Sequence, residues 1–150
     1  MIDNVLDIHN VSEAIRDAVA PVFLLTGIGS ILGVLIGRLG RSIDRARLIY
    51  EMPAERKSKF RAELVIIIKR TKWLRRAIGL ATLAALCVCV SITALFVSVE
   101  TGLKIPHVVM VSFILSMLSI ILALGCFMRE IVLASREIIV PFKRENSEQT

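Results

Sequence analysis

Residues 77–99 read AIGLATLAALCVCVSITALFVSV, a run of 23 residues without a charged side chain. An α-helix rises about 1.5 Å per residue, so this run is long enough to cross a hydrocarbon core about 30 Å thick. Two other runs share this property: residues 18–37 comprise 20 uncharged residues and residues 105–128 comprise 24. The bilayer interior offers no water to backbone groups, so we expect each run to cross the membrane as a helix.

The alternative is a soluble protein in which the same three helices are buried. Hydrophobic residues make up 55% of the 150 residues, and the charged residues cluster between the uncharged runs. Too little polar chain remains to cover three such helices in water. We therefore predict an all-α integral membrane protein with spans at about 20–38, 77–99 and 106–128. Residues 1–140 would form one domain, followed by a polar tail at 141–150.

The helical pattern extends beyond the membrane. After the first span it continues until Pro53, which disfavours helix at the preceding residue. A second helix is expected to begin near Ala54 and to pack against the end of the first in the cytoplasm. Its seam has apolar residues at steps of three and four, which is typical of coiled coils. The seam consists of Phe60, Leu64, Ile67, Thr71, Leu74 and Ile78.

The two ends of the chain carry weaker signals. Residues 4–19 have apolar side chains at helical spacing and predict a short amphipathic helix on the outer membrane surface. This segment carries more acidic than basic residues, unlike a cleavable signal, so the first span should remain in the mature protein. Pro141 is expected to end the third helix near Val140.

The distribution of basic residues predicts the orientation. Residues 38–76, between the first two spans, contain 13 Lys and Arg against four Asp and Glu, whereas residues 100–104 contain one Lys. Basic loops stay on the cytoplasmic side of membranes. The long loop and the C-terminus should therefore be cytoplasmic and the N-terminus outside.

The first span carries glycines on one helical face. Gly29, Gly33 and Gly37 form two consecutive GxxxG steps, and Gly40 follows. Such spacing lets the backbone of a neighbouring helix approach closely. We predict that this face packs against another helix and that the protein is a homo-oligomer.

The third span carries a stripe of small and weakly polar residues that leads to a carboxylate. Ser112, Ser116 and Ser119 lie at steps of four and three, on the face that ends at Glu130. Close helix packing is one interpretation, and it is favoured because small residues are common at membrane helix interfaces. The alternative is that these residues line a water-filled pathway, in which case the protein would be an oligomeric ion or proton channel lined by this helix.

Charged residues collect where the three spans end on the cytoplasmic side, and we call this set the collar. Glu130 should be neutralised there, because an unpaired carboxylate beside the hydrocarbon is costly. Its expected partner is Arg38, Arg41, Arg75 or Arg76, while Asp44 is within helical reach of Arg41 and Arg47. The collar could tie the helices together, bind anionic lipid headgroups or gate protons, and we favour these in that order. It comprises Arg38, Arg41, Asp44, Arg45, Arg47, Arg75, Arg76, Arg129 and Glu130.

Catalytic and cofactor motifs are missing from the sequence. We find no HExxH, GxSxG or glycine-rich phosphate loop and no paired metal-ligand spacing. Cys87, Cys89 and Cys126 fall inside predicted spans, where they suit small apolar packing. The basic residues are those that membrane topology requires, so nucleic-acid binding is not indicated. We expect no enzymatic activity, no cofactor and no metal.

Three stretches resemble a family of small bacterial membrane proteins known only as domain of unknown function 2721. They are PVFLLTGIGSILGVLIGRLGRSIDRARLI at 21–49, RRAIGL at 75–80 and FMREIVLASREI at 127–138. The resemblance implies a three-span bacterial membrane protein and brings no activity with it. The sequence thus favours a self-associating structural or accessory membrane component.

Overall fold

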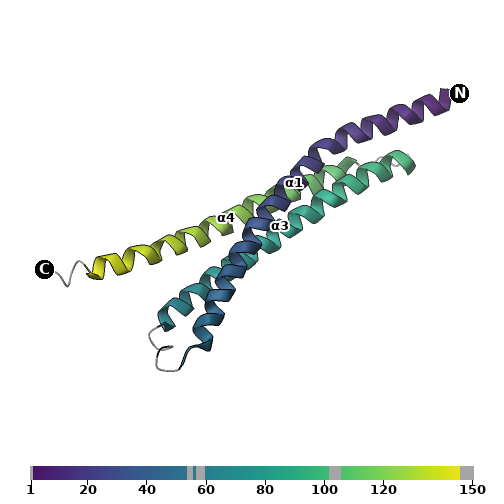
Figure 1. The fold of residues 1–150 in the computed structure, drawn as a ribbon. Helices are drawn as coiled ribbons and strands as arrows, with labels where there is room; N and C mark the ends of the chain where they lie inside the picture. Colours follow the sequence, from purple (N-terminus) through teal and green to yellow (C-terminus); the bar gives the residue numbers. More distant parts are fainter. Residues whose placement is uncertain (1, 54–55, 57–59, 102–105, 146–150) are drawn as a thin grey trace. The chain divides into compact units, whose positions relative to one another are not determined.

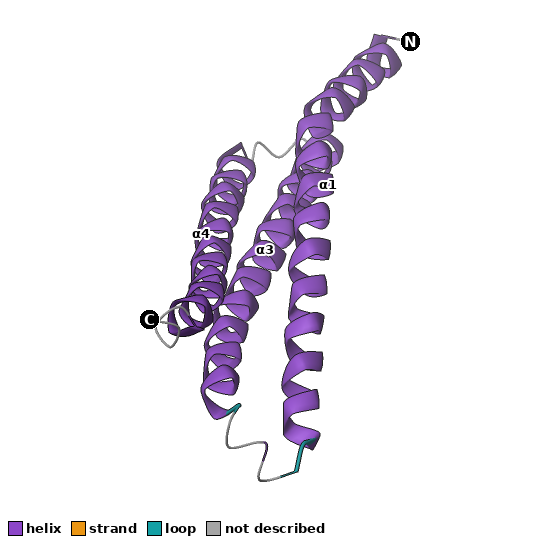
Figure 2. Cartoon of the chain, turned by 60° about the vertical axis from the view of Figure 1, so that its left-hand side comes forward, coloured by secondary structure: helices purple, strands orange, loops and turns teal. Residues whose placement is uncertain are grey.

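The structure, a computed structural model, describes residues 2–53, 56, 60–101 and 106–145. Side chains are described for these residues except 2–11, 14, 62 and 136–145. All regular structure in this part of the chain is helical: α1 spans Ile2–Glu51, α3 Arg61–Thr101 and α4 Pro106–Glu145 (Figures 1 and 2). Each helix contains a segment long and apolar enough to cross a membrane, namely Ile15–Glu51, Glu63–Thr101 and Pro106–Ser135. The predicted all-α, three-span fold is confirmed.

Helix α1 is longer than the first span alone. Residues 4–19, expected as a separate surface helix, form the first part of α1, and Pro21 lies inside the helix. A proline removes one backbone donor, and membrane helices tolerate this loss. The amphipathic character of residues 4–19 stays a prediction, because most of their side chains lie outside the described residues.

Two predicted boundaries are confirmed, since α1 ends at Glu51, before Pro53, and α4 begins at Pro106. Helix α3 begins at Arg61, and the amide of Arg56 donates to the carbonyl of Pro53. The predicted start of this helix near Ala54 lies outside the described residues. The expected end of α4 near Val140 is wrong, since the helix continues through Pro141 to Glu145. Proline lacks only its own amide donor, so the residues that follow it can still donate along the helix. Residues 146–150 of the predicted tail lie outside the described residues.

The chain divides into two compact units. The described residues of the first lie within 2–32 and 80–121, and those of the second within 33–79 and 122–145. Each unit therefore contains a part of α1, a part of α3 and a part of α4.

Small side chains mediate helix contact in the first unit. The Ser116 hydroxyl donates to the carbonyl of Ala84 at 2.9 Å, and the hydroxyls of Ser91 and Ser112 share a hydrogen bond of 2.6 Å. Both interactions join α4 to α3, and Ala84, Ser91 and Ser116 are buried. Small residues let two helix backbones approach until such bonds form. The first unit thus holds α3 and α4 together through alanine and serine.

The second unit has a core of larger aliphatic residues. Leu35 and Ile49 of α1 and Leu74 of α3 are fully buried, and Ile67 of α3 is 6% exposed. Ile49 and Ile67 lie outside the uncharged runs, so water drives their burial, and each such side chain contributes about 1.5–3 kcal/mol. The expected packing of the second helix against the end of the first is therefore observed.

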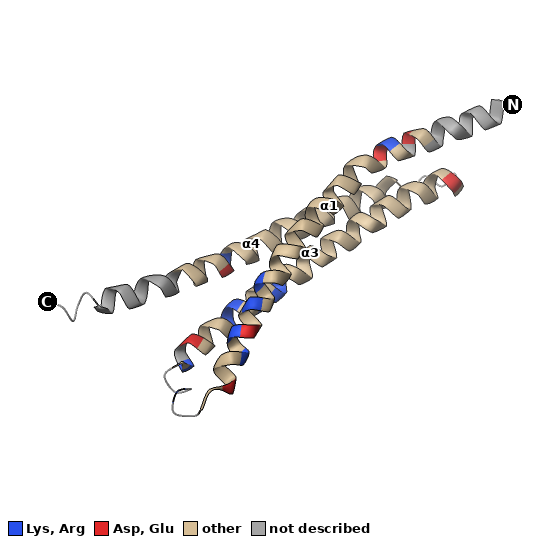
Figure 3. Cartoon of the chain, in the orientation of Figure 1, with Lys and Arg blue, Asp and Glu red and all other residues tan. Residues whose placement is uncertain are grey.

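Figure 3 marks the charged residues along the helices. Lys and Arg gather on the parts of α1 and α3 that approach the segment joining them, while the middle of each helix is free of charge (Figure 3). The polar site described next lies where the uncharged runs of α1 and α4 end and just before the uncharged run of α3 begins.

Candidate functional site

Glu130 is a buried carboxylate on the inward face of α4. It is 1% exposed and follows Ser116, Ser119 and Ala123, all of them buried, at steps of three and four. The step from Ala123 to Glu130 is seven residues, which is two turns of a helix that packs in coiled-coil fashion. The position of Glu130 in this row therefore directs its side chain toward the other helices.

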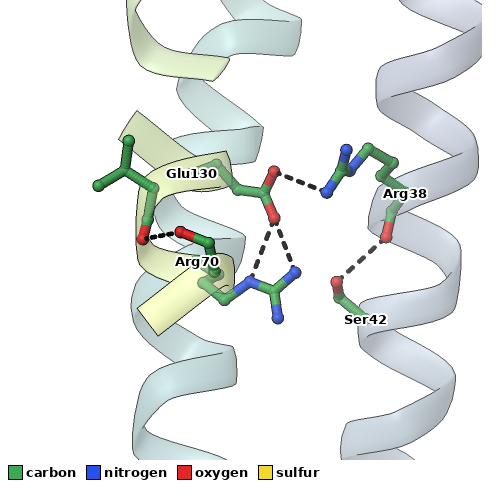
Figure 4. A network of polar contacts seen from close by, with 6 residues as sticks. Arg38, Ser42, Arg70 and Glu130 are labelled. Atoms are coloured by element: carbon green, nitrogen blue, oxygen red, sulfur yellow. Dashed lines mark hydrogen bonds and ion pairs between the residues drawn. The ribbon is translucent and has the colours of Figure 1, made fainter. Parts of the chain in front are cut away.

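Two arginines from two other helices reach this carboxylate (Figure 4). Arg70 of α3 donates from Nε at 3.1 Å and from Nη2 at 2.9 Å, both to Oε1. Arg38 of α1 approaches Oε2 with its Nη2 at 3.4 Å. One acidic side chain thus connects α4 to both α1 and α3 within the second unit. We call Arg38, Arg70 and Glu130 the clasp.

The two contacts of the clasp are unequal. Oε2 of Glu130 is buried and has no hydrogen bond, although it is in ion-pair range of Arg38. Oε1 has two donors from one guanidinium, and charge-assisted bonds of this kind are the strong ones in proteins. The side chains of Arg38 and Arg70 are 30% and 20% exposed, so each extends from the buried carboxylate toward the surface.

Aromatic rings pack against the arginines around the clasp. The guanidinium of Arg38 lies 5.3 Å from the centre of the Phe127 ring. Trp73 of α3 has Arg76 at 5.2 Å and Arg129 of α4 at 5.8 Å from its ring centre. A cation over a ring gains about 0.5–1 kcal/mol at an exposed site. For Arg76 and Arg129, which form no ion pair with a described residue, the Trp73 ring offers a favourable contact beside the apolar runs.

A second ion pair joins α1 to α3 farther along the two helices. Arg45 Nε donates to Glu63 Oε1 at 2.8 Å, with side chains 48% and 33% exposed. Exposed pairs of this kind contribute about 0–1 kcal/mol. This pair is therefore a minor contribution to stability, unlike the clasp.

The arginines of the clasp and Arg45 line one cleft between α1 and α3. Its volume is about 260 Å³. The lining residues are Arg38, Arg41, Ser42, Arg45, Glu63, Ile67 and Arg70. The Ser42 hydroxyl donates to the carbonyl of Arg38 at 3.1 Å, which fixes its side chain on the wall of the cleft. We call this feature the arginine cleft.

The structure brings part of the predicted collar together. Arg38 contacts Glu130, and Arg38, Arg41 and Arg45 line the arginine cleft. Asp44 is within helical reach of Arg41 and Arg47, but among the described residues no basic side chain lies within ion-pair distance of it. The remaining collar members are exposed, and they are Arg47, Arg75, Arg76 and Arg129.

Sequence reasoning missed Arg70 and Glu63. Arg70 belongs to a row of α3 residues at steps of three and four in which its neighbours Ile67, Leu74 and Ala77 are buried. A charged residue in such a row needs a buried partner. This spacing could have identified Arg70 from the sequence, but the predicted seam contained Thr71 in its place. Nothing comparable in the sequence marks Glu63.

In the described part of the chain, the glycine face of α1 has open space beside it. Gly29, Gly33, Gly37 and Gly40 are all exposed. A Cβ built at three of them would have no neighbour within 4 Å, and at Gly37 it would meet only the Arg41 side chain, at 3.9 Å. The predicted packing of these glycines against another helix stays a prediction.

The serines of α4 are used in contacts within the first unit. Ser112 and Ser116 bond to α3, and Ser119 is 4% exposed. Their predicted role in lining a pore remains a prediction. Among the described residues, no group of three His, Cys, Asp or Glu side chains lies close enough to hold a metal ion.

Comparison with known proteins identifies a family and no activity. No curated protein and no solved structure matches the chain. The family model described as "Protein of unknown function (DUF2721)" matches residues 18–140, which include all three spans, the clasp and the arginine cleft. This match covers most of the chain, in agreement with the resemblance noted from the sequence. The chain belongs to the DUF2721 family of proteins of unknown function.

Proposed function

We propose that this three-span protein is a self-associating structural component of a bacterial inner membrane, with copies meeting through the glycine face of α1. The N-terminus lies outside and the collar lies at the cytoplasmic headgroups. The observation that carries the proposal is that α1 has two opposed faces. One is packed inside the chain, and the other exposes the glycines.

Helical geometry separates the two faces. Leu35 is 1% exposed and lies two residues from both Gly33 and Gly37. Two residues correspond to about 200° around a helix, so these glycines lie on the side opposite Leu35. Lipid gives no reason to prefer glycine to leucine, whereas a close helix neighbour does. The glycine face therefore fits a second copy better than it fits lipid.

The test replaces Gly33 and Gly37 by leucine. The chain itself has room for both side chains, because a Cβ at Gly33 meets nothing within 4 Å and one at Gly37 meets only a flexible arginine. The fold of each molecule should therefore persist. We expect the dissociation constant of the oligomer, measured by native mass spectrometry in nanodiscs, to rise by roughly tenfold or more, which corresponds to about 1.4 kcal/mol.

The matched control makes the same change on the other helices. Gly79 of α3 and Gly125 of α4 are exposed, and a Cβ at either meets nothing within 4 Å. The Gly79→Leu/Gly125→Leu variant should assemble like the wild type. Equal assembly of both double variants and the wild type would reject the glycine face as the interface.

The rival function, an oligomeric channel lined by α4, has less support from the geometry. The hydroxyls of Ser112 and Ser116 already bond to α3 within the chain. Proton or ion flux into liposomes discriminates between the two functions. We expect no flux above that of empty vesicles, whereas flux that falls on Glu130→Gln would favour the channel.

The collar is the second part of the proposal. Basic side chains at the cytoplasmic surface attract anionic lipids, each contributing about 1 kcal/mol near such a surface. Association with vesicles should therefore increase with their content of anionic lipid and decrease with salt. We expect this attraction to place the protein in contact with anionic headgroups.

A further inference from the structure

The arginine cleft has an uncompensated positive charge. Four of its lining residues are arginines, and two carboxylates are in contact with them: Glu130 with Arg38 and Arg70, and Glu63 with Arg45. Within the described part of the chain, Arg41 forms no ion pair. Among the described residues, Arg41 thus places a positive charge without an acidic partner inside one concave site. An anion that enters the cleft would be attracted by it.

The clasp holds two of the four arginines in place before any ligand arrives. Arg70 is fixed by two hydrogen bonds to Glu130, and Arg38 is held between the same carboxylate and the Phe127 ring. Arginine presents a planar fork of N–H donors that matches phosphate oxygens. A site whose donors are already ordered loses less entropy when it binds.

We propose that the arginine cleft binds the phosphate group of an anionic phospholipid from the cytoplasmic leaflet. The proposal rests on the collar part of the proposed function and replaces diffuse attraction with one defined site. Arg41 and Arg45 would be the donors that respond to the ligand. Arg38 and Arg70 would shape the site through Glu130.

Size and position favour a lipid over a soluble ligand. The cleft, at about 260 Å³, is smaller than the pockets of roughly 300–1,000 Å³ that enclose drug-sized molecules. It can hold a phosphate and little more. Arg41 follows the uncharged run that ends at Gly37 by four residues, or about 6 Å of helix, which places it in the headgroup layer. The phosphates in greatest supply at that depth belong to lipids.

The experiment measures retention of phosphatidylglycerol by the purified full-length protein, titrated in detergent at about 0.15 M ionic strength and read by native mass spectrometry. The test variant is Arg41→Gln/Arg45→Gln. Both side chains are exposed, so the fold should be preserved, and circular dichroism checks this. We expect lipid affinity to fall roughly 30-fold, because each charge near an anionic surface contributes about a factor of five.

The matched control removes the same charge outside the cleft. Arg47 and Arg76 belong to the collar, are exposed and do not line the cleft. For Arg47→Gln/Arg76→Gln we expect a loss of at most about threefold, since salt screens exposed charges at a distance. Equal losses in the two double variants would overturn the cleft while leaving the collar intact. Equal retention of phosphatidylglycerol and phosphatidylcholine by the wild type would reject the collar as well.

A second variant has the opposite expected sign. Glu63 lines the cleft and accepts a hydrogen bond from Arg45. Glu63→Gln should therefore make Arg45 available to the phosphate and raise lipid affinity by about fivefold, the effect of one charge. Glu51→Gln, at the exposed end of α1, is its control and should change affinity little. An unchanged Glu63→Gln affinity would contradict the proposal.

Inorganic phosphate separates the two sources of the ligand. Millimolar phosphate should leave phosphatidylglycerol bound to the wild type, because the free ion lacks the acyl chains that hold a lipid at this depth. Displacement of the lipid by phosphate alone would show that the cleft serves a soluble anion and would overturn the assignment to lipid.

Discussion

Arg70 and Glu130 lie 60 residues apart in sequence, and Nε and Nη2 of Arg70 donate to the same oxygen of Glu130 at 3.1 and 2.9 Å. The other oxygen of Glu130 has Arg38 at 3.4 Å and no hydrogen bond. The carboxylate is 1% exposed, so it cannot exchange either arginine for bulk water. The charge of the buried Glu130 carboxylate is therefore compensated mainly by Arg70.

We predict that Arg70→Gln destabilises the protein more than Arg38→Gln does. Removing one partner of a buried pair leaves a charge without compensation and costs about 3–5 kcal/mol. Because Arg70 is partly exposed, we expect Arg70→Gln to lower the free energy of unfolding by about 3 kcal/mol, the low end of this range. Loss of Arg38 leaves the two bonds of Arg70 in place and should cost about 1 kcal/mol. The free energy of unfolding in mixed SDS micelles measures both.

Glu63→Gln is the control for that comparison. It breaks an ion pair whose side chains are about half and one third exposed, so the free energy of unfolding should change by less than about 1 kcal/mol. Equal effects of Arg70→Gln and Arg38→Gln would contradict the unequal roles of the two arginines in the clasp.

The three spans follow from the sequence for a simple physical reason. A helix in lipid must satisfy its own backbone over the whole hydrocarbon thickness, so uncharged runs such as 77–99 and 105–128 have few alternatives. The location of the collar follows in the same way, because charged residues can begin only where the apolar run ends. These features depend on one helix at a time and need no knowledge of its neighbours.

Which face of a helix meets which neighbour was harder to predict. Hydropathy does not distinguish a leucine that faces lipid from one that faces a helix. The glycines of α1 stand out in the sequence, yet the face packed within the chain carries Ile28, Leu35 and Ile49. On α3, the seam was assigned from the spacing of mostly apolar residues, and it included Thr71 rather than the charged Arg70. A charged residue in an interior row was thus overlooked because its partner, Glu130, lies on another helix.

We predict that Ser116→Ala weakens the contact between α3 and α4. The Ser116 hydroxyl is fully buried and donates to the Ala84 carbonyl of the neighbouring helix at 2.9 Å. Losing a hydrogen bond of this kind in a membrane protein costs about 0.6 kcal/mol and at most about 1.7 kcal/mol. Unfolding in mixed SDS micelles should show a loss in this range.

Ser135→Ala is the matched change for that prediction. The Ser135 hydroxyl is exposed and bonds only within α4, to the carbonyl of Val132. Its removal should leave the free energy of unfolding unchanged within about 0.5 kcal/mol. If Ser135→Ala lowered the free energy of unfolding as much as Ser116→Ala does, the Ser116 hydroxyl would stabilise α4 itself and not its contact with α3.

The proposed orientation predicts opposite labelling of two introduced cysteines. Arg56, in the segment between α1 and α3, and His107, at the start of α4, are both exposed. With basic loops retained inside the cell, a membrane-impermeant maleimide added to intact cells should label His107→Cys and leave Arg56→Cys unlabelled. Breaking the membrane should expose Arg56→Cys to the reagent, which controls for its reactivity. The native cysteines lie within the spans and should give little background, as the unmodified protein will show. Labelling of Arg56→Cys in intact cells would reverse the orientation and remove the arginine cleft from the cytoplasmic leaflet.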